Sequence, residues 1–161
     1  MTADPVRPVH DPGKEGIPVK LVLLFTMKHR STVSIYSDVL PGGETVGWNV
    51  GEGTVTGERI RGTLQRSNRP WHRADGLQVP DSHGVITTDD GASVFYEFRG
   101  LGRAGEGDRP PEAYGAFTFR TADTRYTWLN SVFAVAERRD RGGAEAVAYD
   151  VYECRPDTDP R

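Results

Sequence analysis

The sequence predicts an all-β protein: a single antiparallel barrel, closed or nearly closed, of about eight to ten strands with at most one or two short helical turns. Short runs of β-branched and aromatic residues recur along the chain, and glycine-rich turns separate them. Almost no segment keeps the apolar spacing of a helix. A chain of 161 residues is one domain's length, and folding can bury roughly 70% of its unfolded surface.

The clearest element is a β-hairpin over residues 83–100, built around Asp90-Gly91. This dipeptide favours a tight turn, since glycine accepts the positive φ that such turns need. A loop of two or four residues places His83 opposite Phe98 and on the same face as Tyr96. That face is mostly apolar and suits the wall of a closed pocket. A three-residue loop would shift the register and remove this assignment.

The N-terminal half of the domain is predicted to form short strands. Residues 19–27 are apolar on both faces, so we expect a first strand covered on both sides. A weaker strand is expected over 32–36, and two or three short strands over 46–65, where Ile60, Gly62 and Leu64 alternate with polar residues. Residues 66–82 are expected to form a long irregular segment.

The C-terminal half is predicted to form three more strands. Residues 123–130 are expected to form a single helical turn capped by Asp123. A rival interpretation makes residues 124–138 a helix, because several apolar residues there share one helical face. The other expected elements are a flexible loop over 101–112, a strand over 114–121, and final strands over 131–139 and 146–154.

Composition narrows the function classes. A net charge of −3 argues against a nucleic-acid partner, and the basic cluster at 28–30 is interpreted as a solvated turn. A single cysteine, Cys154, allows no disulfide within the chain, and neither a signal peptide nor a membrane span is evident. We therefore expect a cytoplasmic protein without membrane contact. Its expected parts are a mobile arm (1–16), the barrel (17–154) and a frayed tail (155–161).

Several segments together resemble a known family. They are VGEGTVTGERIRGTL at 50–64, TTDDGA at 87–92 and FRTADTRYTWLN at 119–130, with Trp71, Asp75-Gly76 and Asp81 between the first two. In this order and spacing they are similar to the bacterial and fungal family known as domain of unknown function 3237, over about residues 19–153. The resemblance implies a small antiparallel barrel with a pocket. It implies no general activity, although some members sit among genes for small-molecule metabolism.

Familiar catalytic motifs do not account for the chain. Residues 100–105, GLGRAG, match a dinucleotide-binding fingerprint, but Pro110-Pro111 follow and no helix is indicated to hold a pyrophosphate. We interpret this segment as a solvent loop. There is no nucleophile elbow, and the histidines lack the spacing of a zinc site. We expect neither a metal nor another cofactor.

A cluster of polar and aromatic residues before the central hairpin is the candidate site. We predict Asp75, Asp81 and His83 as acid/base residues, because an imidazole and a carboxylate in a dry pocket can divide these roles. The predicted substrate-binding residues are Trp71, His72, Tyr96, Tyr114, Trp128 and Asn130. The alternative is that the two aspartates cap turns, His72 lies in solvent and His83 is a hydrogen-bonded wall residue. Asn130 is a separate case: its amide would either point into the pocket as an oxyanion donor or satisfy backbone groups where a turn meets a strand.

These residues indicate a barrel that binds a small, largely apolar metabolite. The leading hypothesis is a cofactor-independent acid/base enzyme of isomerase, cyclase, dehydratase or hydrolase type. The alternative is a non-catalytic ligand-binding or carrier barrel, and a third possibility is a structural or partner-binding subunit. Apolar residues on outer strand faces also suggest a homodimer or a higher homo-oligomer.

Overall fold

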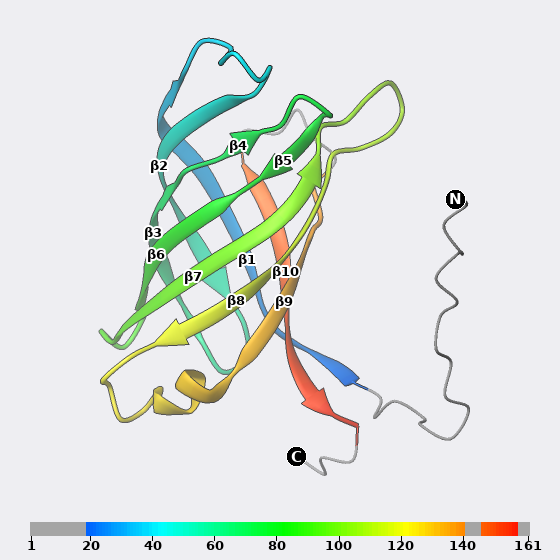
Figure 1. Ribbon diagram of the computed structural model, residues 1–161. Helices are drawn as coiled ribbons and strands as arrows, with labels where there is room; N and C mark the ends of the chain where they lie inside the picture. The colour runs from blue at the N-terminus through cyan, green and yellow to red at the C-terminus, as the bar shows by residue number, and fades with distance from the viewer. Residues whose placement is uncertain (1–18, 141–145, 158–161) are drawn as a thin grey trace, which may run out of the picture.

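The computed structural model describes residues 19–140 and 146–157, so the predicted arm at 1–16 lies outside the described residues. Within them the chain forms ten strands and one 3-10 helix, η1 (Figure 1). The strands are β1 (Val19–Tyr36), β2 (Thr45–Thr56), β3 (Arg61–Asn68), β4 (Trp71–His72), β5 (Leu77–Val79), β6 (Asp81–Thr88), β7 (Ser93–Arg103), β8 (Glu112–Arg120), β9 (Phe133–Arg138) and β10 (Val147–Pro156); η1 is Thr127–Ser131.

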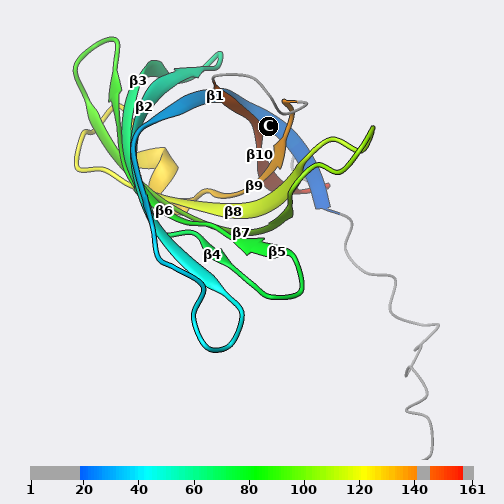
Figure 2. The ribbon, with the colours of Figure 1, turned by 90° about the horizontal axis from the view of Figure 1, so that it is seen from above.

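Eight of the strands close into an antiparallel barrel, as the sequence predicts. Around the barrel the order is β1, β2, β3, β6, β7, β8, β9 and β10, and β10 pairs again with β1. Viewed from above, the strands form a ring (Figure 2). Pairing of the first and last strands removes the open sheet edges that would invite aggregation. In the described residues, no helix is long and apolar enough to cross a membrane.

The expectation of an irregular segment over 66–82 is wrong. β4 continues β3 and β5 leads into β6, so β4 and β5 extend one long hairpin at the end of the barrel that lies uppermost in Figure 1. Pro70 and Pro80 interrupt the two sides of this hairpin, because proline has no N–H for the ladder. Their carbonyls still accept hydrogen bonds from Gly47 and Gly100. We call the half of the barrel that carries β4 and β5 its upper half.

The predicted register of the central hairpin is also wrong. Its loop has three residues, 89–91, because the Thr88 N–H bonds the Ala92 carbonyl at 2.9 Å and Gly91 takes a φ of 88°. Ser82 therefore lies opposite Phe98, one position away from the expected pairing. Since side chains alternate along a strand, Tyr96 points into the barrel and His83 points out.

β1 is longer than expected. The separate strand predicted at 32–36 is the continuation of β1 past a bulge near Ser31 and Val33. The inner face of β1 is covered by the barrel interior. On its outer face Leu21 and Leu23 are more than half exposed in the described structure, so the predicted covering of that second face, by a subunit or by the arm, stays a prediction.

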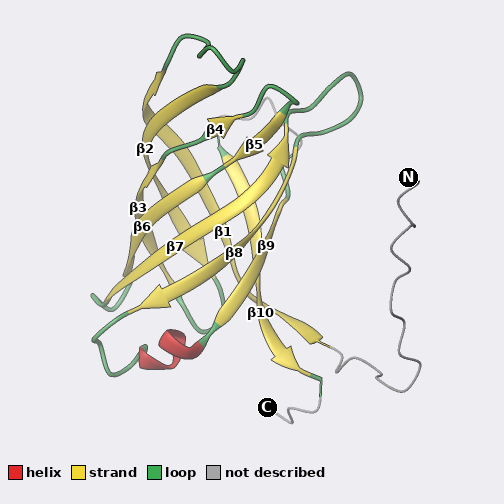
Figure 3. Ribbon diagram, viewed as in Figure 1, coloured by secondary structure: helices red, strands yellow, loops and turns green. Residues whose placement is uncertain are grey.

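The lower half of the barrel, at the η1 end, holds an apolar core. Phe25, Leu64, Ile86 and Val151 are almost fully buried there, and Leu129 of η1 is 0% exposed. Figure 3 shows η1 as a short helix at the lower end of the barrel. The rival helix over 124–138 is wrong, because β9 pairs with both β8 and β10 from Phe133 onward.

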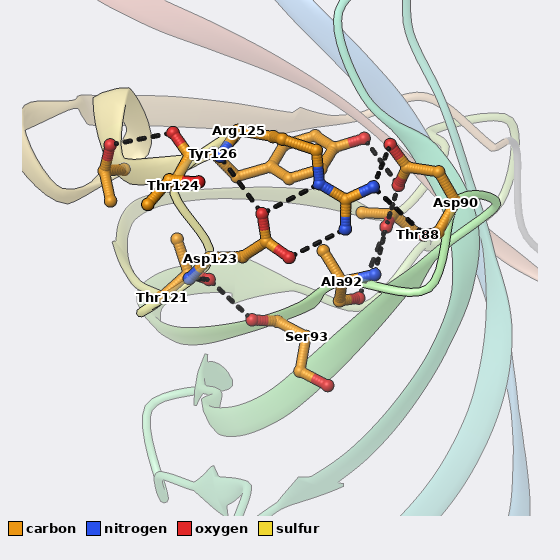
Figure 4. A network of polar contacts seen from close by, with 10 residues as sticks. Thr88, Asp90, Ala92, Ser93, Thr121, Asp123, Thr124, Arg125 and Tyr126 are labelled. Carbon is orange, nitrogen blue, oxygen red and sulfur yellow. Dashed lines mark hydrogen bonds and ion pairs between the residues drawn. The ribbon is translucent and has the colours of Figure 1, made fainter.

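A polar cluster ties η1 to the central hairpin (Figure 4). Arg125 donates to both oxygens of Asp123, at 2.9 and 2.7 Å, and lies 3.1 Å from the Asp90 carboxylate. The Tyr126 hydroxyl donates to the same carboxylate at 2.9 Å. Hydrogen bonds from Arg125 lower the pKa of Asp123 to about 2. Asp123 thus holds the turn before η1, while the residue that precedes the helix is Tyr126.

Candidate functional site

The upper half of the barrel contains an internal cavity of about 230 Å³. It is smaller than the roughly 300–1,000 Å³ typical of pockets for drug-sized ligands. Its apolar walls include Met27, Phe98 and Phe117. Its polar lining residues are His29, Ser31, Tyr36, Asn49, Arg66, Asn68, His72, Gln78, Ser82, Tyr96, Arg138 and Tyr149.

Glycines on the inner face make room for the aromatic walls. A Cβ placed on Gly84 would lie 2.5 Å from the Tyr96 ring, and one on Gly115 would overlap the Phe98 ring. The ring centroids of Phe98 and Phe117 are 4.7 Å apart, and those of Tyr96 and Phe117 are 5.3 Å apart. Such spacing is typical of favourable aromatic pairs. The glycines therefore let large rings shape one side of the cavity.

Arg66 is a buried cation in the cavity wall, with only 8% of its surface exposed. Its Nε donates to His29 Nδ1 at 3.0 Å, and its Nη2 donates to the Ser31 hydroxyl at 3.2 Å. Within the described part of the chain, no carboxylate forms an ion pair with it. Burial lowers the pKa of Arg66, yet a guanidinium keeps its charge near neutral pH. A buried charge without a counter-charge is costly.

His29 is the neutral partner of Arg66. Burial, with the nearby charges of Arg66 and Arg138, lowers the pKa of His29 to about 3. Because Nδ1 accepts the Arg66 hydrogen bond, the proton of the neutral ring is assigned to Nε2. The imidazole stacks on Tyr149, with ring centroids 6.0 Å apart and planes 13° from parallel. His29 thus orients the guanidinium without cancelling its charge.

Two buried polar atoms of the cavity wall have no hydrogen-bond partner in the described structure. They are the Tyr96 hydroxyl and the Asn49 Oδ1. Tyr96 is 3% exposed, and burial raises its pKa to about 12, so it stays protonated and can donate. Such orphaned groups are rare in folded proteins and call for a specific reason.

The arrangement suits the stabilisation of negative charge on a bound molecule. Donors fixed in a low-dielectric site stabilise an oxyanion strongly, because they need no reorganisation when charge develops. Arg66 and Tyr96 are such donors, and both line the cavity. The described residues contain no group of three His, Cys, Asp or Glu side chains able to bind a metal ion.

The structure places the predicted acid/base residues outside this cavity. Asp81 and His83 do approach, with 3.3 Å between carboxylate and imidazole, but both lie on the outer face of β6. Arg69 and Arg99 also contact Asp81, at 3.2 and 3.3 Å. Although partial burial opposes the shift, these hydrogen bonds lower the pKa of Asp81. His83 borders an outer depression of about 590 Å³ over β3, β6, β7 and β8.

Asp75 lies in the turn between β4 and β5. Its carboxylate accepts hydrogen bonds from Arg73 at 2.6 Å and from the Leu77 N–H at 3.2 Å. This is the turn-capping arrangement that we weighed as the alternative. Trp71, in the neighbouring β4, is 43% exposed, with the Arg73 guanidinium 5.9 Å from its ring centroid. Neither predicted residue lines the cavity.

Two of the predicted substrate-binding residues do line the cavity. Tyr96 lies in its wall, and His72 lies near its upper end, with its ring 5.4 Å from that of Tyr36. The predicted convergence of His83 and Tyr96 on one face is wrong, because the hairpin register differs by one residue.

The other three lie elsewhere. Tyr114 is 55% exposed on the outer surface. Trp128 packs at the lower end, with the Arg59 guanidinium 3.5 Å from its ring centroid. Asn130 accepts from the Thr121 N–H at 2.8 Å and donates to the Thr121 carbonyl at 2.9 Å. Its amide is therefore satisfied by backbone, the alternative that we weighed for it.

Sequence reasoning missed His29, Asn49 and Arg66. Ile60, Gly62 and Leu64 alternate along one face of the strand, and the next residue on that face is Arg66. The inward position of this arginine could therefore be predicted from the sequence. The basic cluster at 28–30 belongs to β1, with His29 buried inside. Its interpretation as a solvated turn is wrong.

Known proteins share this fold. A β-barrel-like protein from Acinetobacter baumannii AYE superposes with a TM-score of 0.74 at 22% identity, covering 86% of this chain and 97% of its own. A conserved protein of unknown function from Rhodopseudomonas palustris superposes with a TM-score of 0.72 at 20% identity, covering 86% and 99%. An enzyme from Penicillium herquei gives 0.72 at 21% identity, covering 89% and 99%.

No curated protein matches the chain significantly. The family described as "Protein of unknown function (DUF3237)" matches residues 19–154, from the start of β1 to near the end of β10. The structural matches show the same fold over nearly all of each relative. The chain therefore belongs to the DUF3237 family, as its sequence motifs indicate.

Proposed function

We propose that this barrel binds a small, largely apolar metabolite in its internal cavity and acts on it as a cofactor-independent acid/base enzyme of isomerase, cyclase, dehydratase or hydrolase type. One observation carries the proposal: titratable side chains from three different strands, His29, Arg66 and Tyr96, converge on one cavity inside the barrel. An enzyme needs such convergence, whereas a carrier needs only the cavity.

The chemistry follows from the protonation states. Tyr96 stays protonated and Arg66 stays charged, so together they would stabilise an enolate, phenolate or tetrahedral oxyanion. The imidazole of His72, which also lines the cavity, would take up the proton that the substrate loses and return it to the product or the leaving group. In isomerisation, cyclisation and elimination next to a carbonyl, negative charge develops on that oxygen. The Penicillium herquei protein of the same fold is described as an enzyme, which supports catalysis on this scaffold but names no reaction for this chain.

A thermal-shift titration against a metabolite library tests the proposal, followed by a search for conversion of each hit. A ligand at a hundred times its dissociation constant stabilises the folded state by about 2.7 kcal/mol, which the assay detects. Four variants locate the site. Arg66→Gln and Tyr96→Phe alter the cavity, while Asp81→Asn and His83→Phe alter the outer face of β6.

We expect a hit that wild type converts and the two outer-face variants convert equally well. The cavity variants should convert it at least about a hundredfold more slowly, the usual loss when one oxyanion donor is removed. A hit that binds wild type but is never converted would favour the carrier. Activity lost only in Asp81→Asn or His83→Phe would move the site to the outer face.

A further inference from the structure

We infer that the ligand of the internal cavity carries an anionic, conjugated oxygen, which binds between the guanidinium of Arg66 and the hydroxyl of Tyr96. The inference rests on the proposed binding function and names the class of molecule that the cavity takes. This class comprises small planar carboxylates and acidic phenols or enols.

The charges around the cavity leave a positive excess. Two arginines line it, Arg66 and Arg138. Arg138 is neutralised by Asp140, with hydrogen bonds of 2.9 and 2.8 Å to the two carboxylate oxygens. His29 adds no charge at neutral pH. Within the described residues the charge of Arg66 therefore has no counter-ion, and an anionic ligand would supply one.

The donors available to that anion are free and lie in the same wall. Described side chains accept from two of the five N–H groups of Arg66, namely His29 at Nε and Ser31 at Nη2. The Tyr96 side chain is more than nine-tenths buried, and its hydroxyl has no hydrogen-bond partner in the described structure. Charge-assisted hydrogen bonds from such donors are about twice as strong as neutral ones.

The remaining wall sets the shape of the molecule. The rings of Phe98, Phe117 and Tyr149 line the cavity, and they favour a flat, apolar body. A volume of about 230 Å³ leaves room for a compact molecule. The unpartnered Asn49 Oδ1 is an acceptor, so a hydroxyl on the ligand would satisfy it.

Two matched probe pairs, measured by titration calorimetry at pH 8, test the inference. Benzoate is compared with neutral benzamide, and 4-nitrophenolate with neutral 4-nitroaniline. The first pair tests a carboxylate source of the anionic oxygen and the second a phenolate source. We expect at least one anion to bind about tenfold or more tightly than its neutral partner, the lower end for hydrogen bonds to a charged group.

Variants tie the preference to the two donors. Arg66→Gln should remove the preference for the anion, while Arg30→Gln, at an exposed arginine of β1 that pairs with Glu52, should keep it. Because Arg66→Gln also disturbs His29, Tyr96→Phe gives an independent test. It should weaken anion binding about tenfold or more, the value of one hydrogen bond to a charged group, whereas Tyr114→Phe on the outer surface should not.

The outcomes separate this inference from the function on which it rests. If the neutral partners bind as tightly as the anions, the anion inference fails and the binding function stands. If none of the four probes binds but a library compound does, the anion inference also fails and the binding function also stands. If neither the probes nor any library compound binds, both fail.

Discussion

Polar atoms buried inside the barrel lower its stability. They belong to Arg66, Tyr96 and Asn49, and no contact in the described structure compensates for the unpartnered ones. Each unsatisfied buried polar group costs about 1–3 kcal/mol, and a buried charge costs more. A barrel selected for stability alone would fill these positions with apolar side chains, as its lower half does. Proteins commonly give up stability in this way where they bind or act on a ligand.

Tyr96→Phe should therefore stabilise the ligand-free protein. The ring packing against Phe117 is kept, and an unpartnered buried hydroxyl is removed, so we expect a gain of about 1 kcal/mol in the free energy of unfolding. Urea denaturation measures it. Tyr114→Phe, on an exposed tyrosine, should change stability by less than about 0.5 kcal/mol. A loss of stability in Tyr96→Phe would show that the hydroxyl has a partner in solution.

His29 should make the protein less stable in acid. Its pKa is about 3 in the folded protein, against 6.5 for an ordinary histidine in the unfolded chain. Between these values the unfolded state binds the extra proton. The stability from the neutral imidazole is therefore complete above about pH 6.5 and is lost as the pH falls, at up to about 1.4 kcal/mol per pH unit.

His29→Gln, which keeps an acceptor for Arg66, should flatten this dependence. Urea denaturation at several pH values from 7 to 4 measures the difference in slope from wild type, which separates His29 from the carboxylates common to both proteins. Leu101→Ala, at an exposed position without a titratable group, is the control and should keep the wild-type slope. Equal slopes for wild type and His29→Gln would contradict a depressed pKa at His29.

At the scale of elements, the hairpin of β6 and β7 shows what local sequence does and does not decide. Its existence and strands are predicted correctly, because Asp90-Gly91 marks a turn between two strand-forming runs. Its register is not predicted correctly, because glycine fits both a two-residue turn and the third position of a three-residue loop. The buried Thr88 hydroxyl, which accepts from the Ala92 N–H at 2.8 Å, belongs to the longer loop.

Gly91 should be the residue on which this loop depends. Its φ is 88°, and a Cβ there would meet nothing within 4 Å, so only backbone strain opposes a side chain. Gly91→Ala should lower the free energy of unfolding by about 1–2 kcal/mol, and Gly91→Asn by less, because asparagine tolerates positive φ. Thermal denaturation of both variants measures this. Equal stability of Gly91→Ala and wild type would mean that the loop adopts another turn.

At the scale of the molecule, the barrel could be predicted but its site could not. Strand-like runs and turns occur along the whole chain, so fold class follows from local patterns. The candidate site is a cavity lined from β1, β2, β3 and β7, which supply His29, Asn49, Arg66 and Tyr96. Their meeting depends on which face each strand turns inward. A register that is wrong by one residue predicts His83 inside the barrel, whereas the observed register places it on the outer face together with Asp81. Asn130 could be foreseen as a backbone-binding residue, since its contacts are local.

The two halves of the barrel should separate stability from binding. Leu129 is fully buried in η1 at the lower end, away from the cavity lining, so Leu129→Ala should cost about 2–5 kcal/mol of unfolding free energy. Because folded molecules keep an intact upper half, the variant should bind the tightest probe within about twofold of wild type, provided the titration is run where it is fully folded. Denaturation and calorimetry on the same sample measure both quantities. A large loss of affinity in Leu129→Ala would show instead that the apolar core and the cavity are coupled, and that η1 helps to shape the site from the opposite end of the barrel.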